Sequence, residues 1–396
     1  MSESPRLIHR ITPKNILSFG PECAGVELGS LNLLIGPNGS GKSNLIEVID
    51  LMRASPKDYS DVTRKGGGVG DWIWRGASQG VSTIEVVHSY HHRRREDMLF
   101  HTIEFMSRNQ QFLLSDETVC LSDGQPVYLS EGTDGAGSEV SIIIPEEDGG
   151  GRKWAEAPIR YHNRSVLGQL LDSSRMPELA ALTESYDQIR VYRDWSFGRN
   201  TLFRTPQPAD MRRDRLEEDF SNLGLFLNRL KTEFPAAKRA LLKALQDLYE
   251  GITDFEVNTN GGTVQVFLHE GDFAIPATRL SDGTLRYLCL LAILCDPEPP
   301  PLICIEEPEL GLHPDILPGL ADLLRAASER TQLIVTTHSD ILVDAMTEAP
   351  ECVIVCEKHE GQTEMKRLDA GELSVWLQKY RLGQLWIDGQ LGGKRW

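Results

Sequence analysis

The residues best suited to phosphate chemistry form the stretch "GPNGSGKS" at positions 36–43. It fits the pattern G-x-x-x-x-G-K-[ST], in which glycines let backbone N–H groups surround a phosphate at the positive end of a helix. Lys42 adds a charge for the β- and γ-phosphates, and the Ser43 hydroxyl suits Mg²⁺. The sequence therefore predicts a nucleotide-binding loop. Its residues are Gly36, Pro37, Asn38, Gly39, Ser40, Gly41, Lys42, Ser43 and Asn44.

A second set of chemically suited residues lies in "LICIEEPE", residues 302–309, and in "TTHSD", residues 336–340. Four apolar residues bring Glu306 and Glu307 to the carboxyl end of a buried strand, the edge where open α/β sheets bind ligands. Glu306 is suited to hold Mg²⁺, and Glu307 to orient or deprotonate an attacking water. His338 ends the next apolar strand. Taken alone, the glutamates could be solvated acids at the end of a strand, and His338 a capping or packing residue. Together with the loop, they predict nucleotide hydrolysis with Glu307 and His338 as the catalytic residues.

A third stretch, "LSDGT" at 280–284, combines a helix start with an anion site. Ser281 and Asp282 precede a helix-like run, so Ser281 suits an N-cap. A helix amino terminus with a hydroxyl group and an unencumbered Gly283 also attracts anions. The chain thus contains a second stretch suited to phosphate, far along the sequence from the loop.

The elements expected to position these residues alternate between strands and helices. The apolar run 31–35 is a strand before the loop, and the segment after the loop is a helix with one apolar face. The residues of that face are Leu45, Ile46, Ile49 and Met52. Further apolar runs are typical of parallel strands buried on both faces, and helix-like segments alternate with them. The strands are expected at 302–305, 332–337 and 352–356, and the helices at 284–295, 315–328 and 340–347. This pattern predicts an α/β fold with a mostly parallel central sheet.

Residues 61–274 interrupt the α/β pattern. Alternating apolar and polar residues over 61–165 predict a β-rich segment, shared between a nucleotide-binding head and an insertion in it. Residues 166–274 predict a helical arm and a returning hairpin around an Asn-Gly-Gly turn. We expect one nucleotide-binding head made from residues 1–60 and 275–396, with a large mixed β/α insertion between them. Because the insertion sustains no heptad pattern, a long coiled coil is not expected.

Composition limits the class of protein and of partner. None of the 396 residues belongs to an apolar run of about 18, the length that spans a bilayer, so we expect a soluble cytoplasmic protein with no membrane partner. The net charge of −17 argues against a surface that binds nucleic acid everywhere. Seven cysteines without zinc spacing predict neither disulfides nor zinc. Cys352 and Cys356 are expected to share one buried strand face.

In order along the chain, "GPNGSGKS", "LSDG", "ICIEE", "ELGLHP" and "TTHSD" resemble the Walker A, signature, Walker B, D-loop and H-loop motifs of ABC-type ATPases. The chain looks most like the SMC/RecF-like members, including the heads of OLD-family proteins. The resemblance implies an ABC-type P-loop NTPase head that uses ATP and Mg²⁺, with Ser43 and Glu306 at the metal. It also implies a head-to-tail homodimer. In that dimer the signature residues Ser281, Asp282 and Gly283 complete the γ-phosphate site of the other subunit.

The sequence departs from the family's motifs at two positions and leaves one motif unplaced. Asp282 replaces the first glycine of the usual LSGG signature, and Glu306 stands where Walker B usually has aspartate. Gln79 and Gln188 are both candidates for the Q-loop. Arg75 resembles an arginine that approaches nucleotide in related heads, although an ordinary surface arginine is the more common case.

Two functional hypotheses follow for an ATPase of this kind. In the first, ATP-driven dimerisation controls binding to double-stranded DNA, in DNA repair or anti-phage defence. The segment 190–215 interleaves arginines with aromatic residues and is suited to phosphate and bases, or else forms a solvated linker. The candidate DNA contacts are Arg199, Arg204, Arg212 and Arg213.

In the second hypothesis, the ATPase is a regulatory switch for a toxin or nuclease-like effector and does not itself bind DNA. OLD-family proteins carry a nuclease domain after the head, whereas only 58 residues follow His338 here, so the effector would act in trans. A transporter ATPase ranks third, because the sequence exposes no groove for a membrane subunit.

Overall fold

The computed structural model describes residues 5–76, 80–92, 95–130, 139–145, 152–158, 163–169, 176–195, 198 and 201–393. Within these residues the chain forms two compact units. The P-loop unit comprises Arg6–Ile189, Glu351–Asp369 and Gly389–Trp396. The carboxylate unit comprises Arg190–Pro350 and Ala370–Asp388, together with the residues before Arg6. Each unit is built from segments far apart in the sequence.

The P-loop unit contains an antiparallel sheet of strand order β2-β1-β4-β5-β6-β7-β8-β9. Alternate residues of β6 are buried, as expected for a sheet with one covered face. The predicted β-rich segment thus forms strands, and the amino-terminal strand β1 joins them. The strands are β1 (Ile8–Lys14), β2 (Val26–Glu27), β4 (Ser82–His92), β5 (Arg95–Arg108), β6 (Gln111–Leu121), β7 (Pro126–Ser130), β8 (Glu139–Pro145) and β9 (Arg152–Pro158).

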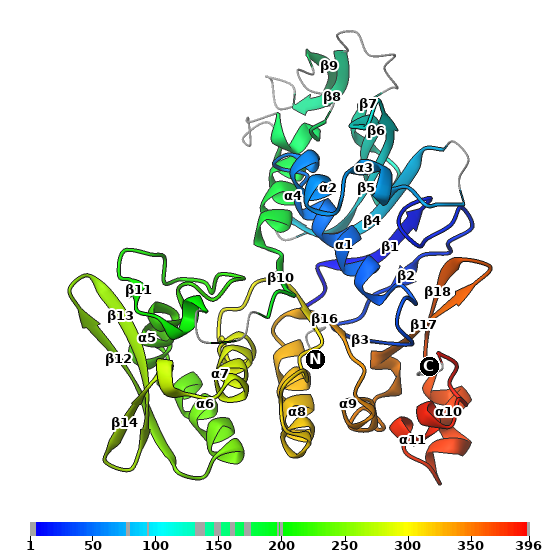
Figure 1. Ribbon diagram of the computed structural model, residues 1–396. Helices are drawn as coiled ribbons and strands as arrows, with labels where there is room; N and C mark the ends of the chain where they lie inside the picture. Colours follow the sequence, from blue (N-terminus) through cyan, green and yellow to red (C-terminus); the bar gives the residue numbers. More distant parts are fainter. Residues whose placement is uncertain are drawn as a thin grey trace. The chain divides into compact units, whose positions relative to one another are not determined.

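The same unit holds the strand and helix on either side of the phosphate loop. Strand β3 (Leu31–Ile35) is buried throughout and pairs in parallel with β17 (Val353–His359), which pairs antiparallel with β18 (Gln362–Arg367). Helix α1 (Lys42–Arg53) follows the loop, and the four residues predicted for its apolar face are fully buried. Helices α2 (Tyr59–Lys65), α3 (Val69–Trp72) and α4 (Pro177–Gln188) complete the unit, with α2 and α4 against the antiparallel sheet (Figure 1).

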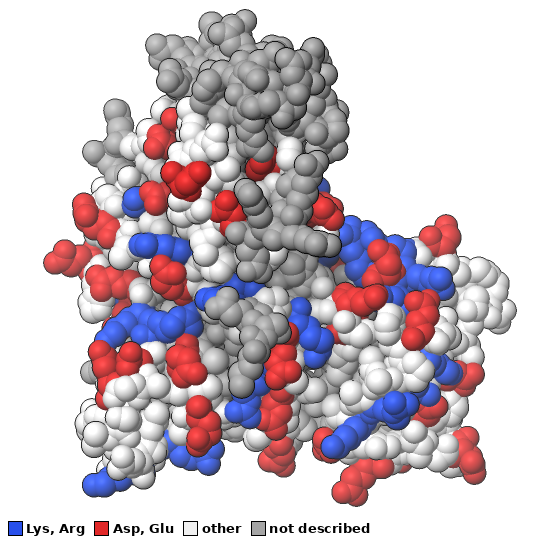
Figure 2. Space-filling view, turned by 180° about the vertical axis from the view of Figure 1, so that it is seen from behind, with Lys and Arg blue, Asp and Glu red and all other residues white. Residues whose placement is uncertain are grey.

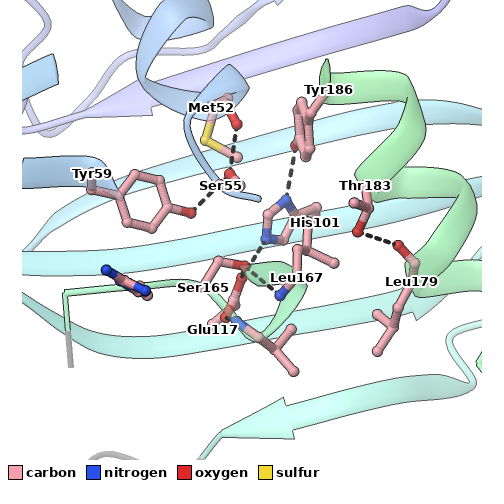
Figure 3. A network of polar contacts seen from close by, with 12 residues as sticks. Met52, Ser55, Tyr59, His101, Glu117, Ser165, Leu167, Leu179, Thr183 and Tyr186 are labelled. Atoms are coloured by element: carbon pink, nitrogen blue, oxygen red, sulfur yellow. Dashed lines mark hydrogen bonds and ion pairs between the residues drawn. The ribbon is translucent and has the colours of Figure 1, made fainter. Parts of the chain in front are cut away.

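A buried polar network lies between α1, α4 and the antiparallel sheet (Figure 3). His101 on β5 shares a hydrogen bond with Glu117 on β6 (Nε2 to Oε1, 3.0 Å) and another with the Tyr186 hydroxyl on α4 (2.8 Å). Glu117, 1% exposed, also accepts hydrogen bonds from the Ser165 hydroxyl and from the N–H of Val166 (2.8 Å). A buried carboxylate is stable only when it is paired in this way, so the network fixes how these elements pack.

The carboxylate unit contains the parallel strands β10 (Arg190–Tyr192), β15 (Leu302–Glu306) and β16 (Gln332–Thr336). Helices α7 (Asp282–Leu294), α8 (Leu317–Ser328) and α9 (Asp340–Asp344) match the three predicted helices to within a few residues. The short helices α10 (Ala370–Leu377) and α11 (Leu382–Ile387) follow, and α11 packs on α9. Strand β10 was not predicted, since three residues inside an arginine-rich segment give no periodic signal.

A second sheet of this unit is the predicted hairpin. Strands β12 (Ile252–Asn260) and β13 (Thr263–Glu270) are antiparallel around Gly261 and Gly262, both with positive φ. Strands β11 (Gln207–Pro208) and β14 (Phe273–Pro276) both pair with β13. Helices α5 (Leu223–Glu233) and α6 (Pro235–Leu248) pack between this sheet and α7 (Figure 1).

The boundaries of the two units differ from those expected for the head and insertion. The predicted arm 166–274 divides near residue 189, because β10 pairs with β15 and carries the rest of the arm into the carboxylate unit. The seven cysteines are free thiols, and Cys352 precedes β17 in a short 3₁₀ helix instead of sharing a strand face with the buried Cys356. Among the described helices, none is long and apolar enough to cross a membrane.

Candidate nucleotide site

The phosphate loop joins β3 to α1 in the P-loop unit, in the strand–loop–helix order that its motif requires. Gly36 has a φ of +146°, and a Cβ atom there would lie 2.2 Å from the carbonyl oxygen of Cys356 on β17, so this position needs glycine. The Lys42 ammonium donates hydrogen bonds to the carbonyls of Gly36 (2.8 Å) and Pro37 (3.0 Å). Lys42 is therefore held across the loop, where the motif places the phosphates.

The loop is supported by two residues that the sequence interpretation did not include, Ser18 and Thr363. The Thr363 hydroxyl contacts the carbonyl of Ser40 (2.9 Å) and the hydroxyl of Ser18 (2.6 Å). Asn44 donates from its amide to the same Ser18 hydroxyl (2.6 Å). These contacts anchor the start of α1 to a turn and to β18. No local pattern marks them, because Ser18 and Thr363 meet only through the fold.

The outer part of the loop is open to solvent. Asn38, Gly39 and Ser43 are exposed, and beside the start of α1 lies a cavity of about 770 Å³. Leu45 of α1 and Thr363 of β18 line the cavity, together with residues that follow β1 and residues of the β17–β18 turn. Its volume lies in the range of small-molecule pockets.

The two predicted carboxylates stand at the carboxyl end of β15 in the carboxylate unit. Glu307 adopts a φ of +46°, uncommon for a residue other than glycine, and its N–H lies near the carbonyl (3.0 Å) and the hydroxyl (3.2 Å) of Thr336. The Glu306 carboxylate faces Arg193 (Oε1 to Nε, 3.8 Å), and its carbonyl accepts a hydrogen bond from Trp195 (2.8 Å). The left-handed backbone conformation of Glu307 costs about 1–3 kcal/mol, so contacts with neighbouring residues must stabilise it.

His338 and Glu307, the two residues predicted to be catalytic, lie close to each other. Nε2 of His338 is 3.7 Å from Oε1 of Glu307, and both side chains are partly exposed, at 29% and 36%. Glu309, which the sequence interpretation did not include, anchors the backbone at His338. One of its carboxylate oxygens accepts from the Thr337 hydroxyl (2.7 Å) and from the backbone N–H of His338 (2.7 Å). Burial raises the pKa of Glu309. The only sequence signal for its role was a third carboxylate in "EEPE".

The signature turn, Ser281–Gly283, begins helix α7 of the same unit. The Ser281 hydroxyl caps the helix by accepting from the N–H of Thr284 (3.0 Å). A Cβ atom on Gly283 would lie 2.9 Å from the carbonyl of Gly311, so the turn packs tightly on the segment after the carboxylates. The Asp282 carboxylate accepts a hydrogen bond from Arg204, which lowers the pKa of Asp282, and another from the N–H of Gly198 (3.3 Å).

Of the arginines predicted to contact DNA, Arg204 has a different position from the one expected. Its side chain is 7% exposed, and its guanidinium also donates to the carbonyl of Leu280 (2.7 Å), so it supports the signature turn. Arg212 is paired with Asp214 (2.5 Å), and Arg213, 68% exposed, lies 3.6 Å from an oxygen of Glu233. Arg199 lies outside the described residues.

On the described surface of the face in Figure 2, Lys and Arg are interspersed with Asp and Glu. The remaining motif candidates are the two glutamines proposed for the Q-loop and Arg75, and two of these three residues are described. Gln188 is at the end of α4 and donates to Glu184 (3.1 Å), and Arg75 is exposed after α3. Gln79 lies outside the described residues.

The family described as "AAA domain, putative AbiEii toxin, Type IV TA system" matches residues 31–92 and 164–344, more than half of the chain. A comparison with curated proteins gives no match. Among solved structures, an SMC head bound to the C-terminal winged-helix domain of ScpA is 14% identical, with a TM-score of 0.59 over 93% of this chain and 100% of that one.

Two other solved structures have the same fold. A Pyrococcus furiosus Smc head with an extended coiled coil, bound to the C-terminal domain of ScpA, is 14% identical, with a TM-score of 0.56 over 94% of this chain and 99% of that one. A Pyrococcus yayanosii Smc head with a coiled coil and joint is 12% identical, with a TM-score of 0.52 over the same shares. At these identities the likeness shows the fold alone. The chain therefore belongs to the family of AAA domains described as putative AbiEii toxin of a Type IV TA system, with the fold of an SMC/RecF-like ABC-type ATPase.

Proposed function

We propose that this protein is an ATPase that requires Mg²⁺ and works as a switch. The pairing of Glu307 with His338, at the end of β15 and β16, is the observation that supports hydrolysis most directly. In this proposal Glu307 accepts the proton of an attacking water, and His338 donates a hydrogen bond to the γ-phosphate. Lys42 supplies the charge for the β- and γ-phosphates. The cavity beside the phosphate loop is large enough to take the nucleoside.

The residues proposed for the metal fit a hard cation. Ser43 is exposed at the loop, and Glu306 presents a carboxylate at the strand end, so both offer oxygen ligands of the kind that Mg²⁺ prefers. When bound, Mg²⁺ would neutralise charge on the phosphates. The glutamate in place of the family's aspartate has its carboxylate facing Arg193 at 3.8 Å. Arg193 would hold the longer side chain in one orientation.

We further propose that ATP drives the formation of a head-to-tail homodimer. The capped amino terminus of α7, with Ser281 and Gly283 at its start, is suited to the γ-phosphate of a second copy. The acidic side chain in this turn is neutralised by Arg204, which supports binding of an anion there. Dimerisation would then be the change of state that ATP imposes and hydrolysis reverses.

What the switch controls is proposed from the family and the surface charges. The family's description names a putative toxin of a Type IV TA system, which supports a link to toxicity. We propose that the switch controls a toxic or nuclease-like effector, in anti-phage defence. A second candidate, binding of double-stranded DNA, is supported by the exposure of Arg213 and by Arg212 in the same segment. Both arginines have acidic neighbours, so the observations favour the effector.

Steady-state ATP turnover tests the proposal. Wild type should hydrolyse ATP only with Mg²⁺, and Lys42→Ala, which removes the phosphate charge, should set the background. Turnover equal to that background would contradict the ATPase. Adding linear double-stranded DNA separates the two candidate outputs: stimulation favours DNA control, and indifference favours an effector.

A further inference from the structure

Buried Arg286 and half-buried Trp195 pack together and form a brace for the backbone of the proposed catalytic residue, Glu307. Arg286 lies on α7, one turn after the signature turn, and is 1% exposed. Its Nη2 atom donates to the carbonyl oxygen of Glu307 at 2.5 Å. Its guanidinium carbon lies 4.3 Å from the centre of the Trp195 ring, while the Trp195 indole N–H donates to the carbonyl of Glu306 at 2.8 Å. Both carbonyls at the end of β15 are therefore held by this pair.

We propose that Arg286, seated on Trp195, is a positioning residue that fixes the backbone of Glu307 and connects it to the signature turn. The inference rests on the proposed ATPase. Thr336 holds the N–H of Glu307 and Arg286 holds its carbonyl, so the peptide groups on both sides of this residue are fixed. With the left-handed φ of +46°, these contacts set the direction in which the Glu307 side chain leaves the backbone, toward His338.

Burying a guanidinium costs desolvation free energy, which a purely structural contact would not require. Burial lowers the pKa of Arg286 to about 10, while the charges of Glu309 and Glu307 act in the opposite direction. At neutral pH it remains a cation whose planar fork and stacking face a lysine cannot reproduce. Its three named contacts are the aromatic ring, a strained backbone carbonyl and nearby acidic groups, all at the proposed site of hydrolysis.

The helix that carries Arg286 also carries the proposed phosphate contact of the second copy. Ser281 caps α7, and Gly283 packs on the carbonyl of Gly311, so this helix touches the segment after β15 at two points, one turn apart. A phosphate that draws the start of α7 toward it would move Arg286 and, through its carbonyl, Glu307. The brace thus gives a physical route by which the second copy's nucleotide adjusts the group that activates water.

The test compares variants that alter one contact at a time. Arg286→Lys keeps the positive charge but loses the planar guanidinium and its set of N–H donors. Trp195→Phe keeps an aromatic ring against Arg286 but loses the indole N–H that bonds to Glu306. A matched control is Arg330→Lys, because Arg330 donates to the carbonyl of Leu294 (2.8 Å) at the other end of α7. The measurements are kcat, KM for ATP, the Hill coefficient and the thermal unfolding midpoint.

We expect Arg286→Lys and Trp195→Phe to lower kcat by roughly 10- to 100-fold, with KM within about threefold and a Hill coefficient close to 1. Arg330→Lys should leave kcat within about twofold, with an unfolding midpoint as low as those of the brace variants. Wild-type kcat in Arg286→Lys would overturn the inference, as would a loss of kcat in Arg330→Lys equal to that of the brace variants. Wild-type turnover no higher than that of Lys42→Ala would instead contradict the ATPase itself.

Discussion

The buried guanidinium of Arg204 donates a hydrogen bond to the carboxylate of Asp282, the residue that replaces a glycine in the signature turn. A negative side chain at a phosphate-binding helix start would repel its ligand. With Arg204 beside it, the turn is close to neutral. We therefore expect Arg204→Met to weaken ATP-driven dimerisation by roughly tenfold or more, because the uncompensated charge of Asp282 then faces the phosphate.

Asp282→Gly provides the control, since it removes the need for Arg204 and restores the common motif. Dimerisation measured by light scattering with ATP should be near wild type in Asp282→Gly and substantially recovered in the double variant. If the double variant dimerises no better than Arg204→Met, Arg204 acts by packing and not by neutralising Asp282.

The buried imidazole of His88 predicts a loss of stability in acid. Burial, helped by the charges of His101 and His9, lowers the pKa of His88 from 6.5 to about 3, and within the described residues neither ring nitrogen has a hydrogen-bond partner. Between these two pH values the unfolded chain binds a proton that the folded chain excludes. Stability should therefore fall as the pH decreases below about 6.5, by up to about 1.4 kcal/mol per pH unit.

His88→Phe keeps a ring against Tyr186 and removes the titrating group. Unfolding midpoints measured from pH 7.5 to 4.5 should fall less steeply in this variant than in wild type. Parallel curves would show that His88 does not take up a proton on unfolding, and that other groups cause the acid sensitivity.

The parts of the site that could be predicted from the sequence were those with a local pattern. The phosphate loop, the carboxylates after 302–305 and the histidine after 332–337 could be proposed because each follows a short apolar run, and the structure has strands at these runs. The anchors of these residues were not found. Trp195 and Arg204 belong to a segment whose arginines and aromatics suggested nucleic acid, yet β10 carries that segment into contact with β15 and α7.

Composition alone could not decide whether the arginines of the segment 190–215 contact nucleic acid or other parts of the protein. An arginine in a loop and an arginine under a helix start have the same local sequence, and only the tertiary partner distinguishes them. Tyr192 and Phe203, two of the aromatic residues in the segment 190–215, are 3% and 6% exposed and pack around Phe220. Ser18 and Thr363, which anchor the loop, gave no signal, since hydroxyl residues are frequent in any turn.

Glu309 should matter for the histidine through its hydrogen bonds and not through acid–base chemistry. One carboxylate oxygen accepts from Thr337 and from the N–H of His338, while the other has no hydrogen-bond partner among the described residues. Glu309→Gln keeps an acceptor oxygen and should retain at least half of kcat. Glu309→Ala loses both bonds and should lower kcat by roughly tenfold, because His338 loses its backbone anchor. Equal kcat losses in the two variants would show that the charge of Glu309 is what matters.

The DNA hypothesis now depends on two described arginines, Arg212 and Arg213. If this segment contacts phosphate, Arg212→Glu with Arg213→Glu should weaken binding to linear double-stranded DNA at least tenfold and reduce its salt dependence. Fluorescence anisotropy at two salt concentrations measures both effects. Arg239→Glu with Lys243→Glu, on the exposed face of α6, is the charge-matched control. Equal weakening by the control would indicate nonspecific attraction, and undetectable binding by wild type would remove DNA from the proposal.

The last prediction separates binding from hydrolysis. Glu307→Gln keeps the backbone contacts with Arg286 and Thr336 and a side chain that can still hydrogen-bond, but removes the carboxylate that would accept a proton from water. ATP should still bind with a similar affinity, turnover should fall by roughly 100-fold or more, and the protein should accumulate as an ATP-bound dimer. Light scattering with ATP and Mg²⁺ measures the dimer, and the same variant with Lys42→Ala controls for association without nucleotide. A monomer at saturating ATP would contradict the shared phosphate site, whereas a dimer that still hydrolyses ATP would contradict the role of Glu307 alone.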